Sequence, residues 1–566
     1  MPPLDFRLGI DVGGTNTDAV ILDRSDQVLA KAKVPTTPDV TGGIVAALDA
    51  VIGTSEVDVS RITHAMLGTT HATNAVLERR KLHRVAVIRI GAPATLGVRP
   101  MFEWPADLTA VVSAGATVVA GGIEFDGRDL SPFDDEAVAR FLGSVAGRCD
   151  GVAITSVFAP VSPRHELLAA EIVKRELGEV HVSLSHEIGS VGLLERENAT
   201  ILNAALAGVA GDVARAVGHA LAAHSLSPVT FFAQNDGTLM ALDHALRYPV
   251  LTIGSGPANS IRGAAFLTGR TDALVADVGG TSTDVGVLVN GFPRESSQGV
   301  EIGGIRTNFR MPDLVTIALG GGTVVSVRAA ARPTRALGQT LPVGARAVRL
   351  GPESVGYRLR DEALVFGGST PTLTDSAVAT GRARLGDPSL AQPARRLLEA
   401  ASRAADVELA DAIDRVKTAK GDLALIAVGG GSILIPDELA GVSEVIRPHH
   451  FDAANAIGAA IASVSGQVDR IFHFGPGGRK AALDEASQEA RDHAVAAGAD
   501  PDTVQIVELE EIPLAYLNSP AVRIRAKAAG ALGGLYERAP GSTERPRGGM
   551  SDARAPGSTE YSPSQN

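Results

Sequence analysis

The sequence predicts an α/β fold built from two similar halves, and three observations predict it. Residues 8–18 read L-G-I-D-V-G-G-T-N-T-D, and residues 274–284 nearly repeat them as L-V-A-D-V-G-G-T-S-T-D. In both copies, apolar runs of strand character lie before and after the central glycines. At 566 residues, the chain is too long for a single hydrophobic core. A duplicated fold, with one copy of the stretch in each half, accounts for all three.

Each copy is predicted to form a β-hairpin whose tip binds phosphate. Glycine allows positive φ in the turn and close approach of a ligand, and consecutive N–H groups there form an anion-binding concavity. Since a carboxylate repels phosphate, the leading acids Asp11 and Asp277 are expected to hold hydrated Mg²⁺. For a single copy, a tight turn with a capping acid explains the pattern equally well, but the duplication favours phosphate. The predicted phosphate cradle is Gly13, Gly14, Thr15, Asn16 and Thr17 in the first copy and Gly279, Gly280, Thr281, Ser282 and Thr283 in the second.

Composition excludes several classes of function. The net charge is −12 and the chain has no long basic block, which argues against nucleic-acid binding. The single cysteine, Cys149, excludes an internal disulfide and a multi-cysteine metal site. Asp5 and Arg7 interrupt the N-terminus before any long apolar run, and no run is expected to reach transmembrane length. We therefore expect no membrane association and a cytoplasmic location.

The first 90 residues predict the order β-β-β-α-β-α-β, which suits a mixed sheet with helices on its faces. Residues 6–34 contain three strands separated by short polar turns. A helix at 41–52, a strand at 62–67, a helix at 71–81 and a strand at 85–90 follow.

A third candidate site, G-T-T-H-A-T-N, lies at residues 68–74, where a strand runs into a helix. This arrangement directs hydroxyl and N–H groups to one place, so Thr69, Thr70 and Asn74 are predicted to orient a phosphate acceptor. Helix capping by one of the two threonines is the alternative. His71 is more typical of a satisfied polar residue than of a base or metal ligand.

The middle of the chain adds an irregular region at 91–130, with three prolines and the only tryptophan. We expect an inserted surface region that covers a substrate. Buried strands are predicted at 151–158 and 181–185, and a long Ala-rich helix ends near His224. The polar residues before and within this helix form either a helix surface or a functional cluster. They are His186, Glu187, Glu195, Arg196 and Asn198.

In the second half, residues 249–261 predict a strand, a Gly-Ser-Gly-Pro loop and a helix whose N-terminus favours an anion. Glycine triplets at 320–322 and 429–431 lie between apolar β-runs and indicate close approach of the backbone to a ligand. Gly320 and Gly321 are therefore assigned to the nucleotide site, and Gly429, Gly430 and Gly431 are expected to contact its adenosine.

Two halves with phosphate hairpins imply a fold that closes on a nucleotide. No G-x-x-x-x-G-K-[ST] loop is present, and no strand–G-x-G-x-x-G–helix unit opens the chain, so P-loop and dinucleotide-binding folds are disfavoured. The arrangement resembles the actin-like ATPase superfamily, with duplicated ribonuclease H-like domains and a nucleotide cleft between them. The predicted units are residues 1–200, residues 201–467, a small α/β appendix at 468–536 and a Pro/Gly/Ser-rich disordered tail at 537–566.

Within that superfamily, five motifs occur in order over residues 6–465: D-V-G-G-T-N-T-D, L-G-T-T-H-A-T-N-A-V-L-E-R, G-S-G-P-A, D-V-G-G-T-S-T-D-V and L-G-P-E-S. Together they resemble a short form of the hydantoinase/oxoprolinase family. The resemblance implies ATP and Mg²⁺ as cofactors, phosphorylation of a carbonyl or enol oxygen, a cyclic amide such as a hydantoin or 5-oxoproline as substrate, and a second hydantoinase-type subunit. A ketone carboxylase-type subunit, a small-molecule kinase and a nucleotide-dependent regulatory protein remain alternatives, and a homo-oligomer is left open.

The chain departs from the longer members of this family in two places. Those members carry a further extended domain after the last glycine motif, where this chain has a short appendix. They also tend to have a histidine-bearing stretch where residues 301–322 here contain R-T-N-F-R-M-P-D. These departures leave open whether a transition-metal site carries over from the longer members to this chain.

Overall fold

The computed structural model describes residues 6–37, 40–55, 57–189, 191–296, 299–308, 311–327, 348–417, 421–474, 478–513 and 521–533. The tail predicted at 537–566 lies outside these residues.

The first hairpin belongs to a nine-stranded sheet with the order β22-β23-β21-β10-β9-β4-β1-β2-β3. Strands β1 and β2 pair antiparallel and place Asp11 opposite Asp18. Strand β4 runs parallel to β1 and places Gly68 opposite Asp11. The N-terminal strands are β1 (Phe6–Val12), β2 (Asn16–Leu22), β3 (Val28–Pro35) and β4 (Ile62–Thr69).

The second hairpin repeats this arrangement in a six-stranded sheet. Strands β11 and β12 pair antiparallel with Asp277 opposite Asp284, and β19 runs parallel to β11 with Val428 opposite Asp277. The predicted duplication of an α/β unit is therefore confirmed at the level of strand register. The strands of this sheet are β11 (Ala273–Val278), β12 (Thr283–Val289), β13 (Phe292–Pro293), β16 (Leu314–Ile317), β19 (Leu423–Val428) and β20 (Val442–Ile446).

Two helices, α9 (Ser255–Thr268) and α14 (Ala454–Ile461), join the halves. They pack closely because small residues face each other: a Cβ atom at Gly458 would lie 1.9 Å from the Asn259 carbonyl oxygen. Helix α14 also lies against β1, while α9 lies against β11 and β12. Polar side chains on these two helices therefore reach the space between the two hairpins.

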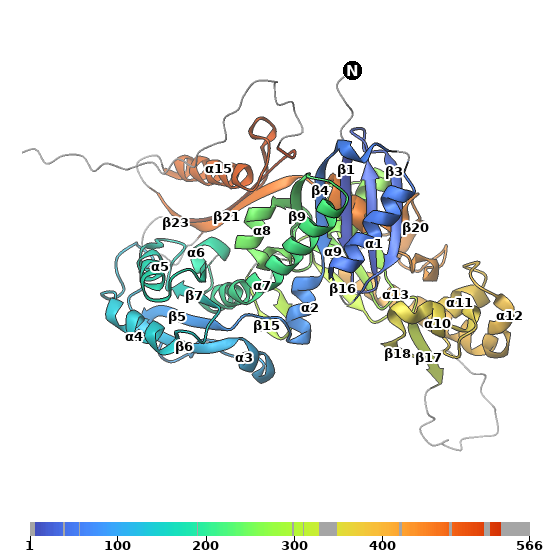
Figure 1. The fold of residues 1–566 in the computed structure, drawn as a ribbon, viewed down its shortest axis with the longest axis horizontal. Helices are drawn as coiled ribbons and strands as arrows, with labels where there is room; N and C mark the ends of the chain where they lie inside the picture. Colours follow the sequence, from blue (N-terminus) through green and yellow to red (C-terminus); the bar gives the residue numbers. More distant parts are fainter. Residues whose placement is uncertain are drawn as a thin grey trace, which may run out of the picture.

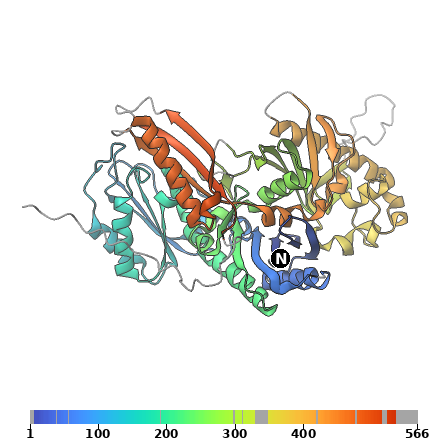
Figure 2. The ribbon, with the colours of Figure 1, turned by 90° about the horizontal axis from the view of Figure 1, so that it is seen from above.

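An inserted domain forms a separate parallel sheet with the order β6-β5-β7-β8. It lies at one end of the molecule, and the α10–α12 region lies at the other end (Figures 1 and 2). The region 91–130 was predicted to be irregular, but it contains α3 and β6. Strand β6 pairs with β5 and completes this sheet. The elements are β5 (Val85–Ala92), α3 (Ala106–Val112), β6 (Ser113–Ala120), α4 (Asp135–Val145), β7 (Gly151–Ser156), α5 (Arg164–Leu177), β8 (His181–Leu184) and α6 (Ser185–Ile188).

Helix α7 (Leu193–Ala223) connects the inserted domain to the first half. Contrary to the sequence expectation, it is long and apolar enough to cross a membrane by length and composition. More than half of its apolar stretch is buried, and it packs against α1 (Val40–Gly53), α2 (His71–Glu78) and β7. These contacts are those of a core helix.

The C-terminal segment extends the first sheet instead of forming an appendix. Strand β21 (Val464–His473) pairs with β10 (Leu239–Ala241) and β23 (Ala521–Gly530), and α15 (Gly478–Ala496) covers β21. The sheet thus collects strands from both sides of the division predicted at residue 200. The remaining described strands and helices are β9 (Val229–Ala233), α8 (Leu242–Arg247), β14 (Glu301–Ile302), β15 (Ile305–Arg306), β17 (Thr323–Val327), β18 (Val348–Ser354), α10 (Leu359–Glu362), α11 (Leu373–Ala379), α12 (Pro388–Ala391), α13 (Arg395–Val416) and β22 (Gln505–Pro513).

Candidate functional site

The two hairpin tips have the same turn and face each other. In the first, the Gly13 N–H donates to the Asn16 carbonyl at 3.0 Å; in the second, the Gly279 N–H donates to the Ser282 carbonyl at 2.9 Å. The predicted positive φ is wrong for all four tip glycines. Small size matters at Gly280 instead, because a Cβ atom there would lie 3.2 Å from the Thr15 side chain, whereas a Cβ atom on Gly14 would meet nothing within 4 Å.

Asp11 is the buried acid of the first hairpin. Its side chain lies next to Gly68, where a Cβ atom would come within 2.4 Å of Asp11 Oδ1. That oxygen is buried and has no hydrogen-bond partner in the part of the chain that the structure describes. Burial, reinforced by the nearby Asp18 carboxylate, raises the pKa of Asp11 to about 7. An unpaired buried carboxylate oxygen costs free energy unless a cation or donor satisfies it.

Asp277 occupies the equivalent place in the second hairpin but has protein partners. Ser260 on α9 donates to Asp277 and also contacts Asn455 on α14. The Asn455 amide in turn donates to Asp11 Oδ2 at 3.4 Å. Burial raises the pKa of Asp277, and the Ser260 hydrogen bond opposes that shift. Helices α9 and α14 therefore link Asp11 with Asp277. The lack of a side chain at Gly429 leaves room for the Asp277 carboxylate.

Two further acids and one lysine complete the charge of the cleft. Lys33 lies 2.7 Å from Asp18, and its charge also lowers the pKa of both Asp11 and Asp277. Burial raises the pKa of Asp284 to about 6, although Thr316 donates to it at 2.6 Å.

The charge of this cleft fits a hydrated divalent cation. Four carboxylates face a single lysine among the contacts described above. Two of their oxygens, Asp11 Oδ1 and Asp18 Oδ1, have no hydrogen-bond partner among the described residues, although Asp18 Oδ1 lies 2.7 Å from Lys33 Nζ. Within the described ranges, no three His, Cys, Asp or Glu side chains are placed to enclose a metal directly. Mg²⁺ needs no such cage, since it retains several waters and takes one or two carboxylates. The residues present therefore fit Mg²⁺ better than a directly ligated transition metal.

The hydroxyl groups predicted to cradle phosphate divide into two sets. Thr17 and Thr283 are fully buried; the first bonds Thr36 Oγ1 at 3.3 Å, and the second donates to the Leu319 carbonyl. Both lie in the last strand pair before the turn, where these bonds hold them. The residues of the turn itself are more accessible: Thr281 is exposed, and Thr15, Asn16 and Ser282 are partly buried.

The glycine triplets bind the backbone of the second hairpin. The N–H groups of Gly321 and Gly322 donate to the carbonyls of Gly279 and Gly280 at 3.0 and 2.7 Å, and the Gly431 N–H donates to the Val278 carbonyl at 2.8 Å. Of the later triplet, only Gly430 faces open space. The triplets thus support the phosphate hairpin, and Gly430 is left as the place where a ligand can approach.

The residues of the G-T-T-H-A-T-N motif point in two directions. Thr70 donates to the Val12 carbonyl at 3.3 Å and accepts from Asn74. This pair therefore lies beside the turn of the first hairpin. Thr69 lies on the opposite face of the sheet from Asp11, because side chains alternate along β4. Its hydroxyl bonds His71 Nδ1 at 2.7 Å in a small apolar cavity. The prediction that Thr69 orients an acceptor with Thr70 and Asn74 is not met by this geometry.

The segment at 249–261 begins differently from its prediction. Residues 249–252 form a 3-10 turn instead of a strand, and the helix that follows is α9. Its first turn lies against the motif at 68–74: Ser255 Oγ donates to the Thr69 carbonyl at 3.3 Å, and Gly256 lies beside Thr70. The helix N-terminus predicted to favour an anion is therefore next to the first hairpin.

Sequence reasoning missed Ser260, Asn455 and Lys33. Ser260 lies in the stretch at 249–261 that was singled out for its glycine loop, and Asn455 lies in D-A-A-N-A-I-G at 452–458. No local pattern could join them, because their role depends on the crossing of α9 and α14. Lys33 could have been found from β2–β3 pairing, since it lies opposite Asp18.

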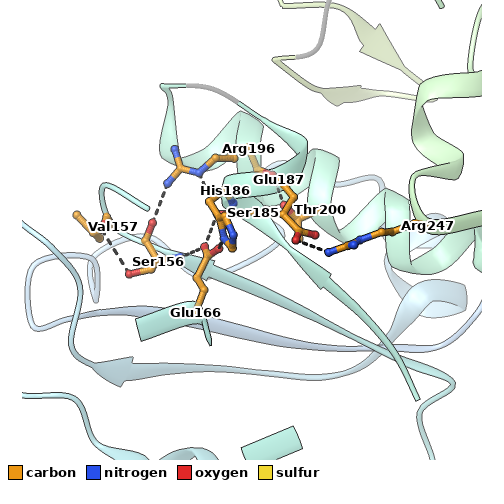
Figure 3. A network of polar contacts seen from close by, with 9 residues as sticks. All are labelled: Ser156, Val157, Glu166, Ser185, His186, Glu187, Arg196, Thr200 and Arg247. Atoms are coloured by element: carbon orange, nitrogen blue, oxygen red, sulfur yellow. Dashed lines mark hydrogen bonds and ion pairs between the residues drawn. The ribbon is translucent and has the colours of Figure 1, made fainter. Parts of the chain in front are cut away.

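In the polar cluster near the start of α7, Arg196 and Asn198 are buried, while the other three residues are partly exposed. Arg196 and His186 belong to a network around Glu166. Figure 3 shows Glu166 directed at Ser185 and His186, with Arg196 reaching Ser156 from α7. Glu166 and Arg196 have exposed fractions of 0% and 2%. The network lies in the inserted domain, apart from the hairpins.

Comparison with known proteins agrees with the motif reading. A model of the hydantoinase/oxoprolinase N-terminal region matches residues 7–177, and a model of the hydantoinase/oxoprolinase domain matches residues 196–387. The chain is 26% identical over 400 residues to the caprolactamase subunit alpha of Pseudomonas jessenii, covering 67% of this chain and 55% of that protein. It is also 26% identical over 406 residues to the acetophenone carboxylase gamma subunit of Aromatoleum aromaticum, covering 66% and 53%.

The solved structure of the ATP-dependent caprolactamase from Pseudomonas jessenii has the same fold. It matches with a TM-score of 0.68 at 20% identity, over 92% of this chain and 87% of that chain. The chain spans about half the length of the curated relatives it matches.

Proposed function

Because this chain belongs to the hydantoinase/oxoprolinase family, we propose that it is an ATP-dependent subunit that activates a cyclic amide for hydrolysis. In this proposal, ATP transfers its γ-phosphoryl group to the carbonyl oxygen of the substrate, and water then opens the ring. An amide carbonyl is a poor electrophile, and phosphorylation of its oxygen gives the carbon a good leaving group.

One observation carries the proposal: two matching hairpins face each other across buried acids that lack enough positive charge. Asp11 and Asp277 would hold hydrated Mg²⁺, which neutralises phosphate charge when bound. The accessible groups of the tips, Thr15 and Thr281, and the nearby backbone N–H groups would position the phosphates. Phosphoryl transfer depends mainly on such positioning and charge stabilisation.

The surroundings of the first hairpin suit an acceptor. The N-terminus of α9 places backbone N–H groups beside Thr70, and Asn74 bonds the Thr70 hydroxyl. The positive end of a helix stabilises negative charge that develops on a transferred phosphoryl group. We assign the acceptor carbonyl to the space bounded by Thr70, Asn74 and the first turn of α9.

A ketone carboxylase-type subunit is the second candidate, favoured by the similarity to the acetophenone carboxylase gamma subunit. Both candidates use the same first step. They differ in what attacks the phosphorylated species: water in the amide hydrolases and a carboxylate donor in the carboxylases. Since both relatives are named as subunits, we propose that a second subunit contributes to the later step.

Substrate-stimulated ATP hydrolysis tests the proposal. The chain, alone and co-expressed with the protein encoded beside it, is assayed for ADP release with hydantoin, 5-oxoproline and ε-caprolactam, and with acetone plus bicarbonate. Stimulation by a cyclic amide, with ring-opened product equal to ADP, supports the hydrolase. Stimulation only by the ketone with bicarbonate supports the carboxylase. A stable phosphorylated product would contradict both and indicate a kinase.

A further inference from the structure

One stripe of α9 carries an asparagine whose side chain is bonded to neither hairpin. Gly256, Asn259, Ser260 and Gly263 have the spacing of a single helix face. Gly256 lies beside Thr70, and Gly263 packs against α14. Asn259 has the largest side chain of this stripe. It lies between the space assigned to the acceptor and the crossing of the two helices.

The amide of Asn259 is buried and unpaired. The residue has an exposed fraction of 0%, and neither Nδ2 nor Oδ1 makes a hydrogen bond within the described part of the chain. Ser260, the next residue, differs in this respect, because it bonds both Asp277 and Asn455. A buried amide without partners costs free energy at both of its ends. An asparagine at position 259 therefore disfavours folding unless a ligand satisfies it.

Asn203 on α7 shows how this fold treats an amide that supports its structure. It is 1% exposed. Its Nδ2 donates to Ser183 Oγ at 2.9 Å and to the Arg247 carbonyl at 3.0 Å, and its oxygen accepts from the Val250 N–H at 3.2 Å. Both ends of this amide are satisfied by the protein. The contrast with Asn259 indicates that the latter is kept for something other than stability.

The amide of Asn259 lies next to the orphaned oxygen of Asp11. A Cβ atom at Gly68 would lie 2.6 Å from Asn259 Nδ2 and 2.4 Å from Asp11 Oδ1. Because both atoms lie so close to one point, they are at most 5.0 Å apart, yet they make no hydrogen bond to each other. The lack of a side chain at Gly68 is what lets both groups occupy this place. One free donor and one free acceptor therefore border the same spot between β4 and α9.

The types of these two groups identify water as the ligand between them. The carboxylate oxygen only accepts, and the amide N–H only donates. A phosphate oxygen could accept from Asn259 but would repel Asp11, whereas water can accept from the first and donate to the second. Two hydrogen bonds of about 2.8 Å that meet at a tetrahedral oxygen place their outer atoms about 4.6 Å apart. This separation lies within the 5.0 Å limit set by Gly68.

We propose that Asn259 is a positioning residue of the cation site, an inference that rests on the proposed function. Its N–H donates to a water molecule of the cation's hydration shell, and that water donates to Asp11 Oδ1. Mg²⁺ keeps several waters when it binds to proteins, so the same shell offers a donor to the Asn259 oxygen. The amide thereby fixes how Asp11 holds the hydrated cation, and the hydration shell satisfies both ends of the amide.

The Mg²⁺ dependence of nucleotide binding tests this role. In Asn259→Ala, the Mg²⁺ concentration that half-saturates AMP-PNP binding is expected to rise about tenfold or more, the usual effect of removing a group that orients a metal ligand. At saturating Mg²⁺, the affinity for AMP-PNP should return to within about twofold of wild type, because the contacts to the nucleotide are unchanged. Asn259→Leu fills the space of the amide without its polar atoms and should give the same rise. Calorimetric titration at a series of Mg²⁺ concentrations measures both quantities.

Thermal unfolding in EDTA separates this role from a structural one. Asn203→Ala is the matched control, because it breaks three hydrogen bonds of a buried amide. It should unfold at a lower temperature than Asn259→Ala, which breaks none, and should keep the Mg²⁺ dependence of wild type.

Three results would overturn the inference alone: an unchanged half-saturating Mg²⁺ concentration in both Asn259 variants, a loss of affinity that saturating Mg²⁺ does not restore, or a greater loss of stability in Asn259→Ala than in the control. Wild-type protein that binds no AMP-PNP in the presence of Mg²⁺ would overturn the proposed function as well.

Discussion

The two phosphate hairpins share a sequence, a register and a turn, but they differ in how their surroundings hold them. In the second hairpin, N–H groups of two glycine triplets bond the backbone carbonyls of the tip, and Ser260 bonds Asp277. In the first, Thr36 Oγ1 donates to the Gly13 carbonyl at 2.8 Å, while Asp11 keeps a buried oxygen with no hydrogen-bond partner among the described residues. The acid of the second hairpin is thus held by the protein, and under the proposed function a cation would satisfy the acid of the first.

The largest effect is expected on turnover. Asp11→Asn removes the unpartnered carboxylate and Asp277→Asn removes its counterpart, so each should lower Mg²⁺-dependent ATP turnover by about 100-fold or more. Steady-state ADP release measures it. If the comparison is right, Asp11→Asn has the greater effect, because Asp277 already accepts a hydrogen bond from Ser260, whereas Asp11 Oδ1 has no partner among the described residues. Equal turnover in wild type and Asp11→Asn would remove Asp11 from the cation site.

The same difference predicts a gain in stability for Asp11→Asn without Mg²⁺. The folded pKa of Asp11 is about 7 and its ordinary value is 3.8, so folding disfavours the ionised form. The penalty is absent well below pH 4, grows as pH rises and is complete above pH 7, where it amounts to roughly 4 kcal/mol. Thermal unfolding in EDTA at pH 5 and pH 8 measures it. Asp11→Asn should gain more stability over wild type at pH 8 than at pH 5, and a larger gain at pH 5 would contradict this account.

A smaller effect is expected from adding a methyl group to the glycine triplet at 429–431, which supports the second hairpin. In Gly431→Ala, the new Cβ atom would lie 2.6 Å from the Gly279 carbonyl oxygen, and overpacking of this kind costs about 2 kcal/mol. Gly430→Ala is its matched control, because nothing lies within 4 Å of the new atom. Chemical denaturation should separate the two variants. Equal losses would show that the triplet does not support the hairpin through close packing.

The smallest effect concerns one hydroxyl that holds the first tip. Thr36→Val removes the bond to the Gly13 carbonyl, and the loss of one such bond costs about 1 kcal/mol. The Thr36 N–H bond to the Thr15 carbonyl is kept, so the variant should fold, and the loss should appear as roughly fivefold weaker nucleotide binding. The control, Ser354→Ala, removes the 3.3 Å bond to the Gly280 carbonyl in the well-supported second tip. A larger loss in Ser354→Ala would reverse the comparison.

The sequence predicted the hairpins and their acids because both are local features. Asp11 and Asp18 lie seven residues apart with glycines between them, so a tight turn necessarily brings them together. The expected strands at 6–34 and the helix at 41–52 match β1, β2, β3 and α1, since alternation and helical periodicity are encoded in neighbouring residues.

What the sequence could not provide depends on contacts between distant segments. Ser260 and Asn455 reach the cleft only because α9 crosses α14. The region at 91–130 was judged from its prolines and tryptophan, yet its strand at 113–120 is fixed by pairing with β5. Residues 249–252 have strand-like composition but form a 3-10 turn that begins with proline, which lacks an N–H for a sheet.

The directions in which Thr17 and Thr69 point could have been predicted from strand alternation alone. Both lie in strands, where neighbouring side chains point to opposite faces, so neither shares a face with the acid or glycine next to it. Thr17 is buried beside the turn of its hairpin, and Thr69 points to an apolar cavity. Counting strand alternation from Asp11 and Gly68 would have separated tip residues from supporting residues.

Calorimetric titration with AMP-PNP tests the central claim most directly, that the two hairpins bind Mg²⁺ and ATP between them. It should be run with and without Mg²⁺ on wild type, Asp11→Asn, Asp277→Asn and the exposed control Asp49→Asn. The account predicts micromolar binding that requires Mg²⁺, is weakened at least tenfold by either hairpin variant, and is unchanged in the control. Binding of equal affinity in wild type and both hairpin variants, or binding indifferent to Mg²⁺, would contradict it.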